Sequence, residues 1–113
     1  MCFVGVFEPP SSFVAKKAEC TLSGMRALVG GYIESLSAPL PEHFFLFDED
    51  GRYKHLEPNV GASLVSKVYP HDCLLGDVVF VRYNSARDNW AGWDTEEDVY
   101  DAYRRLKECV FPS

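Results

Sequence analysis

Residues 28–34, with the sequence LVGGYIE, constrain the fold of this chain more than any other stretch. The pattern predicts a short helix that ends at the glycine pair, because glycine adopts the left-handed backbone conformation at little cost. A strand is expected to begin directly after it. The β-prone run at residues 43–47 then leads into an acidic turn at residues 49–51, which is a hairpin signal. This order of elements predicts a mixed fold with antiparallel strands, but it identifies no chemistry.

Further strands are predicted on either side of this region. The apolar runs at residues 2–7 and 77–83 each have the composition of a strand. Residues 52–56 are expected to return from the acidic turn as another strand of an antiparallel meander. Residues 84–92 are polar and predict a loop.

Three helices are predicted from residues that commonly cap helix N-termini. Thr21 precedes apolar residues at helical spacing, Asn59 follows a proline, and Thr95 has Asp98 three places on, a variant of the capping box. Together the elements predict an α+β fold, an antiparallel sheet of four to five strands with two to three helices packed mainly on one face. The length and the lack of a visible linker predict a single domain over residues 1–113.

The charge of the chain argues against nucleic acid as a partner. Its formal net charge is −6, whereas proteins that neutralise phosphates concentrate lysine and arginine. Acidic residues gather in the last quarter of the chain and are expected to give one end of the molecule a negative field. They are Asp88, Asp94, Glu96, Glu97, Asp98 and Asp101.

The cysteine pattern predicts an intracellular protein. Cys2, Cys20, Cys73 and Cys109 lie far apart, and none belongs to a Cys-x-x-Cys pair of the kind that binds zinc. No signal peptide precedes them, and no apolar run is long enough to span a bilayer. We therefore expect reduced thiols, most of them small buried apolar groups, in a cytoplasmic protein that makes no contact with a membrane.

No motif for catalysis or metal binding satisfies the chemistry that it would need. Aligning Gly51 with the glycine of an EF-hand loop places Leu46 at the first ligand position, and leucine offers no oxygen. His71 and Asp72 lack evident further metal ligands, and there is neither a nucleophile elbow nor a phosphate-binding loop. We expect no metal, no cofactor and no catalytic residue, and therefore no enzyme.

Trp90 and Trp93 are the first candidates for a binding surface. They lie in the predicted polar loop beside the acidic residues Asp94, Glu96 and Glu97. Aromatic anchors next to concentrated negative charge suit a protein partner with a basic surface, and such binding would depend strongly on salt. Loop tryptophans also often cover the open end of a core, so both interpretations stand.

A second candidate site would bind a small ligand. Tyr32 and Glu34 share one strand face, and Asn59 would either cap its helix or join them in a polar pocket together with Arg52 and Lys54. The cations available for an anionic ligand, such as a nucleotide signal, are Arg26, Arg52, Lys54 and Arg82. Convergence of two or more of these cations on one cleft would favour this site over the tryptophan site.

From residue 28 to about residue 107 the chain resembles domain-of-unknown-function family 3846, small proteins frequent in phage, plasmid and other mobile genomes. Four blocks carry the resemblance, at residues 28–34, 48–51, 57–62 and 72–79. The N-terminal strand lies outside the motif, and aspartates 48 and 50 stand where asparagine and glutamate are more usual. The family has no established activity, so the resemblance implies no catalytic residue. Because such proteins occur in mobile genomes, the resemblance implies binding to a host component, such as a defence factor.

These observations leave three functions from different classes. The leading hypothesis is a non-enzymatic intracellular protein-binding module of phage, viral or mobile-element type, acting through the tryptophan site on a host or self protein. The alternative is a small-molecule or nucleotide-signal binding protein that uses the Tyr32 site. A third option is a homo-oligomer in which an exposed β edge or the N-terminal strand pairs between copies.

Overall fold

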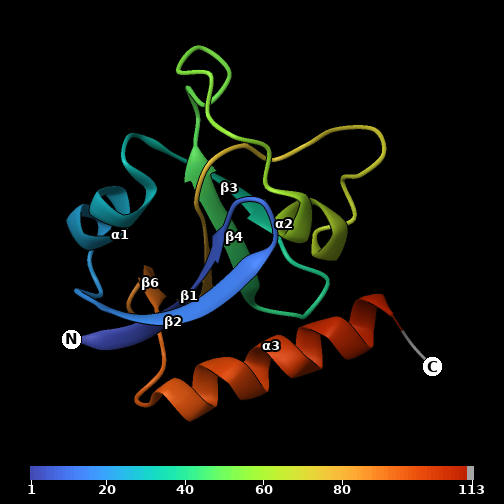
Figure 1. Ribbon diagram of the computed structural model, residues 1–113. Helices are drawn as coiled ribbons and strands as arrows, with labels where there is room; N and C mark the ends of the chain where they lie inside the picture. The colour runs from blue at the N-terminus through green and yellow to red at the C-terminus, as the bar shows by residue number, and fades with distance from the viewer. Residues whose placement is uncertain (112–113) are drawn as a thin grey trace.

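The structure is a computed structural model that describes residues 1–111, and in this part of the chain six strands form one antiparallel sheet (Figure 1). The strands are β1 (Cys2–Glu8), β2 (Ser12–Ala18), β3 (Ile33–Ser37), β4 (His43–Asp48), β5 (Val78–Asn84) and β6 (Asn89–Ala91). Their order is β2-β1-β5-β4-β3, and the short β6 pairs with β5 outside this path. The helices are α1 (Leu22–Val29), α2 (Val60–Val65) and α3 (Glu96–Val110). The predicted α+β class is confirmed.

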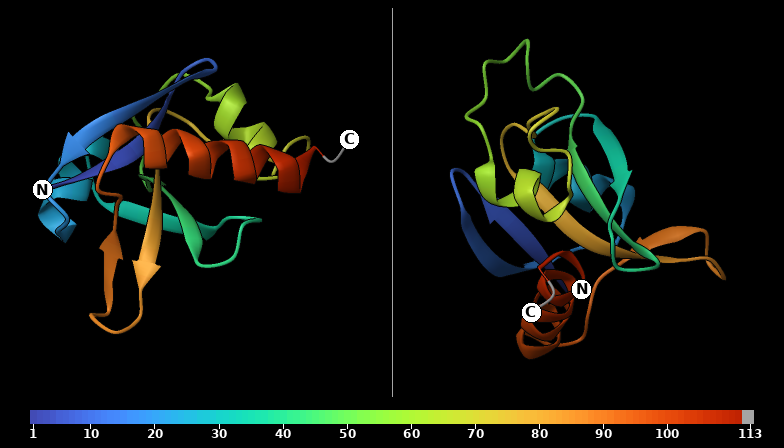
Figure 2. Two further views of the ribbon diagram at one scale, coloured as in Figure 1. Left: turned by 90° about the horizontal axis from the view of Figure 1, so that it is seen from below. Right: turned by 90° about the vertical axis from the view of Figure 1, so that its right-hand side faces the viewer.

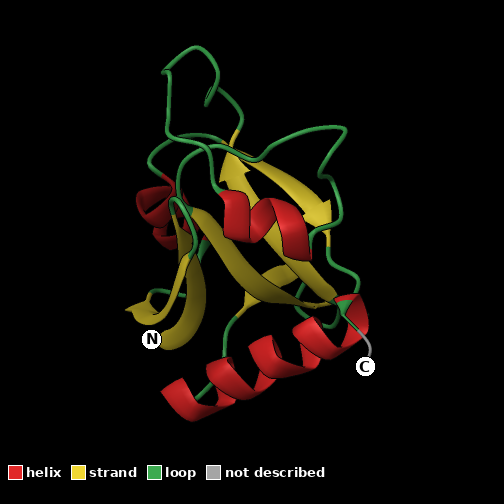
Figure 3. Ribbon diagram, turned by 45° about the vertical axis from the view of Figure 1, so that its right-hand side comes forward, coloured by secondary structure: helices red, strands yellow, loops and turns green. Residues whose placement is uncertain are grey.

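The sheet has a hydrophobic core on each face. Helices α2 and α3 cover one face, where the core includes Phe7, Phe45 and Phe80 (Figure 3). Helix α1 covers the other face, and its buried Met25 and Val29 join a smaller core there. Two of the three helices therefore lie on one face, as predicted.

The predicted helix starts are correct in detail. Thr21, Asn59 and Thr95 each accept a hydrogen bond from the backbone N–H three residues on, at 3.0–3.1 Å. The glycine pair ends α1 as expected, with Gly30 at a φ of 89°. No helix of the described residues is long and apolar enough to cross a membrane.

Two segments differ from the prediction. Residues 52–56 are not a strand, because the chain after Asp48 closes into successive tight turns, with the Lys54 N–H bonded to the Asp50 carbonyl at 3.0 Å. β5 lies beside β4 in the place expected for that strand. The polar segment 84–92 is a β-hairpin instead of a loop, because β6 turns back onto the end of β5.

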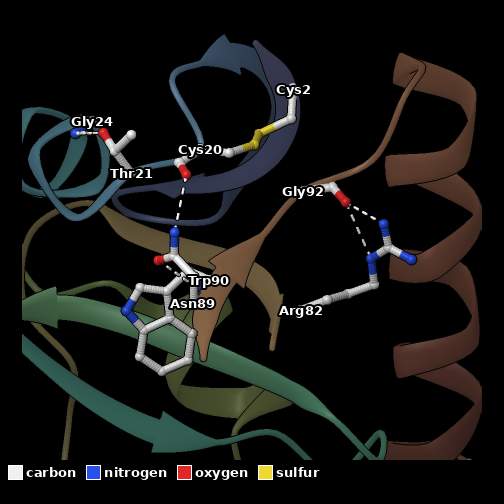
Figure 4. The surroundings of a disulfide bond; sticks show 8 residues. All are labelled: Cys2, Cys20, Thr21, Gly24, Arg82, Asn89, Trp90 and Gly92. Atoms are coloured by element: carbon white, nitrogen blue, oxygen red, sulfur yellow. Dashed lines mark hydrogen bonds between the residues drawn. A yellow bond between two sulfur atoms is a disulfide. The ribbon is translucent and has the colours of Figure 1, made fainter. Parts of the chain in front are cut away.

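A disulfide corrects the expectation of four reduced thiols. Cys2 and Cys20 are joined, while Cys73 and Cys109 are free (Figure 4). The β1–β2 hairpin explains the pairing, since its register sets Cys2 opposite Ala18, two residues before Cys20. Their Cα atoms are 6.0 Å apart, within the range for a disulfide.

Candidate functional site

Trp93 is part of the core and is not a surface anchor. Its side chain is only 7% exposed, and its ring centroid lies 5.5 Å from that of Phe80 and 5.7 Å from that of His43. The Arg82 guanidinium lies over the indole ring and also donates to the Gly92 carbonyl. The prediction that Trp93 contacts a partner is therefore wrong, and its other interpretation, as a cover over the end of the core, is correct.

Of the other residues of the tryptophan site, Trp90 packs against neighbouring side chains and the acidic residues are exposed to solvent. Trp90 is half-buried on β6 and packs against Phe44 and Tyr83, with ring centroids 5.2 and 5.5 Å away. The acidic residues at the start of α3 are exposed, namely Asp94, Glu96 and Glu97. This surface therefore offers negative charge, but Trp93 is buried and Trp90 is half-buried, so neither is an exposed aromatic anchor.

At the opposite end of the sheet, Asp48 holds the turns between residues 48 and 56 in place. This buried carboxylate accepts from the Lys54 ammonium at 2.6 Å and from the Asp50 N–H at 2.8 Å. Burial acts to raise the pKa of the Asp48 carboxyl, but the bonds from Lys54 and from the Asp50 backbone outweigh it and hold the pKa below its ordinary value. Lys54 also donates to the Gly30 carbonyl at 3.2 Å and so connects these turns to the end of α1.

A cleft of about 330 Å³ opens between β3, β4 and the segment of residues 68–75. We call it the β3 cleft. Its apolar lining is buried or half-buried and comprises Leu36, Phe47, Val68, Leu74 and Leu75. Its exposed charged lining residues are Glu34, Glu49, Arg52 and Asp72. Arg52 and Asp72 form an ion pair at 2.7 Å, which leaves Glu34 and Glu49 as the carboxylates without an ion-pair partner among residues 1–111.

A broader, shallower hollow of about 660 Å³ lies on the other side of the turns. It is lined by Arg26, Tyr32, Asp50 and Lys54, among others, and we call it the Tyr32 hollow. The Arg26 guanidinium lies 5.1 Å from the centre of the Tyr32 ring. Two of the four candidate cations therefore do share one hollow, as the ligand-binding alternative required. Their charges are largely balanced, however, because Asp48 neutralises Lys54 and Asp50 lines the same hollow.

The remaining residues of the ligand-binding alternative lie apart. Glu34 and Arg52 line the β3 cleft instead of the Tyr32 hollow. Asn59 is fully buried, and its amide donates to the Phe7 and Gly76 carbonyls at 2.8 Å each. It is therefore a structural residue, and the prediction that it contacts a ligand is wrong. Among the described residues, no three His, Cys, Asp or Glu side chains are grouped so as to hold a metal ion.

β3 forms an open edge of the sheet beside the β3 cleft. Figure 2 shows it in teal, in the right-hand view, as the outermost strand. Two backbone hydrogen bonds bracket the strand: the Ala38 N–H donates to the His43 carbonyl of β4, and the Glu49 N–H, one residue past β4, donates to the Tyr32 carbonyl. Because these bonds alternate along an antiparallel strand, the N–H and C=O groups of Ile33, Ser35 and Ser37 face away from the sheet.

Several residues of the β3 cleft are candidates from the sequence, but the sequence does not predict that they lie together. The sequence predicts Glu34 and Arg52 at a ligand site with Tyr32, and it predicts Glu49 as part of a turn. Asp72 is a candidate metal ligand in the sequence and part of the block at residues 72–79. Residues 48–52 and 68–75 line the same cleft because of tertiary contacts. The spacing of residues along the sequence does not predict such contacts.

One of the three comparisons with known proteins gave a match, and that match is to a family model. Neither the curated proteins nor the solved structures gave a match to it. A family model described as Domain of unknown function (DUF3846) matches residues 4–104, which includes β1 from its third residue and all of β2, as well as the four blocks identified in the sequence. The N-terminal strand is thus part of the family pattern, contrary to expectation. The chain belongs to the DUF3846 family.

Proposed function

We propose that the chain is a non-enzymatic protein-binding module. It contacts its partner at the end of the sheet that carries the turns of residues 48–56, the β3 edge and the β3 cleft, which we call the loop end. The observation that carries this proposal is the open β3 edge beside a cleft with an apolar lining and an excess of negative charge. An edge strand presents unpaired backbone groups, and natural proteins usually cover or protect such edges. The opposite edge is partly covered, since the Tyr100 hydroxyl on α3 accepts from the Ala15 N–H of β2 at 3.2 Å.

Exposed tyrosines around the loop end support the same surface. Tyr32, Tyr53 and Tyr69 are 62%, 86% and 58% exposed. Tyrosine is enriched at protein interfaces because it combines a large apolar ring with a hydrogen-bonding hydroxyl. Trp93, three residues before α3, is by contrast only 7% exposed.

Affinity capture with matched charge variants tests this assignment. The wild-type chain is compared with Glu34→Gln/Glu49→Gln, which neutralises the β3 cleft, and with Glu96→Gln/Glu97→Gln, which removes the same charge from α3. Mass spectrometry then identifies the proteins and metabolites retained from cells that contain the protein naturally. A protein partner lost only with the cleft variant supports the proposal. A partner lost only with the α3 variant, or retained by both, overturns the assignment to the loop end.

We further propose an intracellular setting of phage or mobile-element type, with a host component such as a defence factor as the partner. The resemblance to proteins of phage and plasmid genomes supports this setting. The Cys2–Cys20 disulfide supports an oxidising compartment instead, because disulfides persist mainly in such compartments. Alkylating thiols in intact cells before lysis separates the two settings. Four modified cysteines support the cytoplasm, and two modified cysteines at positions 73 and 109 support an oxidising compartment.

Small-molecule binding in the Tyr32 hollow is the second candidate. The stacked Arg26 and Tyr32 side chains favour it, since together they offer a planar surface and a cation to a nucleotide-like ligand. The balanced charges of Lys54 with Asp48 place it second, because a phosphate group needs unpaired cations. Calorimetric titration with a panel of nucleotides tests it. Binding that is lost in Arg26→Ala supports this site, and the absence of heat for every nucleotide excludes it for that class.

A further inference from the structure

The β3 edge and the β3 cleft together define the class of partner, provided that the loop end is the binding surface proposed above. We infer that the partner contributes an extended basic segment. This segment adds to β3 as a further strand and places a lysine or arginine side chain between Glu34 and Glu49. Main-chain bonds along an open edge and a pocket for alternate side chains are the two parts of strand-addition recognition.

The backbone of β3 is suited to accept a strand. Ile33, Ser35 and Ser37 present their N–H and C=O groups outward in alternation, as an interior strand presents them to its neighbour. No hydrogen bond within residues 1–111 uses these outward groups. A strand of a partner would therefore find up to three residues of free main-chain donors and acceptors, with no rearrangement of the β3–β4 pair.

Side-chain alternation directs part of the added strand toward the cleft. Successive side chains of a strand point to opposite faces of its sheet. Leu36 packs against the core on the α2 and α3 face, and Glu34, two residues earlier, lies on the same face at the cleft. Every second side chain of the added strand would lie on this face, beside these two residues.

The charges of the cleft select a cationic side chain. Phe47 is directly opposite Glu34 in the β3–β4 register. Glu49, one residue past β4, continues the pairing through its N–H bond to the Tyr32 carbonyl and lines the same cleft as Glu34. Such diagonal neighbours are separated by roughly 7–8 Å in a sheet, so a single cation between them can contact both carboxylates. The volume of about 330 Å³ lies at the low end of the range of roughly 300–1,000 Å³ for small-molecule sites. It suits one long side chain with an apolar stem, which Leu36 and Phe47 would contact.

A second copy of the chain is a poorer occupant of the same edge. Each copy carries a net charge of −6, and antiparallel pairing of β3 with β3 about Ser35 would set each Glu34 diagonally opposite the Glu34 of the other copy. Like charges placed side by side across an interface oppose association.

The proposal is tested by selecting short random peptides displayed on a surface against the wild-type chain. Enriched peptides are then synthesised, and their affinities are measured against two variants. Ser35→Pro removes an outward N–H without removing a bond to β4, which is a position where an edge strand tolerates proline. Ser35→Ala is its control, because it keeps the N–H. Glu34→Gln/Glu49→Gln removes the cleft charge while keeping the side-chain shapes.

We expect lysine or arginine to be enriched at one position of the aligned peptides, the position whose side chain lies between Glu34 and Glu49. The affinity should fall at least about tenfold with Ser35→Pro and about tenfold with the double glutamine variant, which corresponds to about 1.4 kcal/mol for each effect. Ser35→Ala should leave it unchanged. Peptides that depend on the two glutamates but bind Ser35→Pro normally overturn strand addition and leave the proposed binding surface intact. Enrichment of acidic or uncharged peptides, or a chain that sediments as a dimer which Ser35→Pro disrupts, overturns the basic partner.

Discussion

At the β6 end of the sheet the aromatic side chains pack against one another, whereas at the loop end they point into solvent. Trp93 is 7% exposed, while Tyr53 and Tyr69 are 86% and 58% exposed. The difference follows from what covers each end. Helix α3 begins three residues after Trp93 and packs on the same core, whereas no helix of the described residues lies beyond the β3 edge (Figure 2). An aromatic residue in a polar segment is therefore a weak guide to a binding surface until its cover is known.

The carboxylates of the two ends also differ in their structural roles. Glu96, Glu97 and Asp98 occupy the first turn of α3, where negative charge is stabilised by the helix dipole. Glu34 and Glu49 line a cleft in which the neighbouring cation, Arg52, is already paired with Asp72. The acidic cluster most prominent in the sequence thus has a structural explanation, and the less prominent pair does not.

The largest expected effect is on the β6 end, with Trp93→Ala. Removing a buried indole from the contacts with Phe80 and His43 should lower the free energy of unfolding by about 4 kcal/mol. Trp90→Ala, at a half-buried position, should give a clearly smaller loss. Urea unfolding followed by circular dichroism measures both. A loss of less than about 1 kcal/mol for Trp93→Ala would contradict a core role.

Breaking the Cys2–Cys20 bond should have the next largest effect. The bond closes a loop with a sequence separation of 18, and a disulfide around a loop of this size stabilises a protein by about 3 kcal/mol in the chain-entropy model. Urea unfolding of the wild-type chain with and without reductant measures the difference. The Cys2→Ser/Cys20→Ser variant should match the reduced protein and should not respond to reductant. Equal midpoints for the oxidised and reduced chain would show that the hairpin alone holds this region.

At the loop end, Asp48→Asn should lower the free energy of unfolding by about 2 kcal/mol at neutral pH, because it removes a charged acceptor from the Lys54 ammonium. The folded-state pKa of Asp48 lies below its ordinary value of 3.8. The folded chain therefore binds fewer protons at this site than the unfolded chain. The stabilisation is present above that value and is lost as the pH falls through the folded-state pKa.

Unfolding curves at about pH 7, 5 and 3 test this linkage. The difference between the wild-type chain and Asp48→Asn should shrink as the pH falls. A difference that stays constant with pH would mean that the substitution acts through packing and not through the charge of the carboxylate.

Much of the fold was predictable from local signals in the sequence. The caps at Thr21, Asn59 and Thr95 and the glycine pair depend on backbone geometry within one turn, and all were correct. The predicted strand at residues 52–56 was wrong because the Asp48–Lys54 contact folds that segment into turns. That contact combines a buried acid with a lysine six residues later, a pairing that strand propensity does not register.

The candidate site was less predictable because it depends on long-range contacts. The β3 cleft brings residues 34–36 next to residues 72–75, and nothing in the spacing of the chain links them. Cys2 and Cys20 illustrate the same limit, since their pairing follows from the hairpin register and not from a cysteine motif. Trp93 could be recognised as a cover for the core, but choosing between core and partner required the position of α3.

The smallest expected effect on stability distinguishes the charge of the β3 cleft from its shape. Arg52→Ala breaks an ion pair whose side chains are 75% and 55% exposed, so the free energy of unfolding should change by less than about 0.5 kcal/mol. The substitution frees the Asp72 carboxylate in the cleft, and a basic peptide should therefore bind a few times more tightly than to the wild-type chain. Arg104→Ala is the matched control, because it breaks the exposed Arg104–Asp101 pair on α3 and should leave the peptide affinity unchanged. Isothermal titration with one enriched peptide measures both variants. Weaker binding to Arg52→Ala would indicate that Arg52 itself contacts the partner, and equal tightening in both variants would indicate a general effect of net charge in place of a cleft that selects cations.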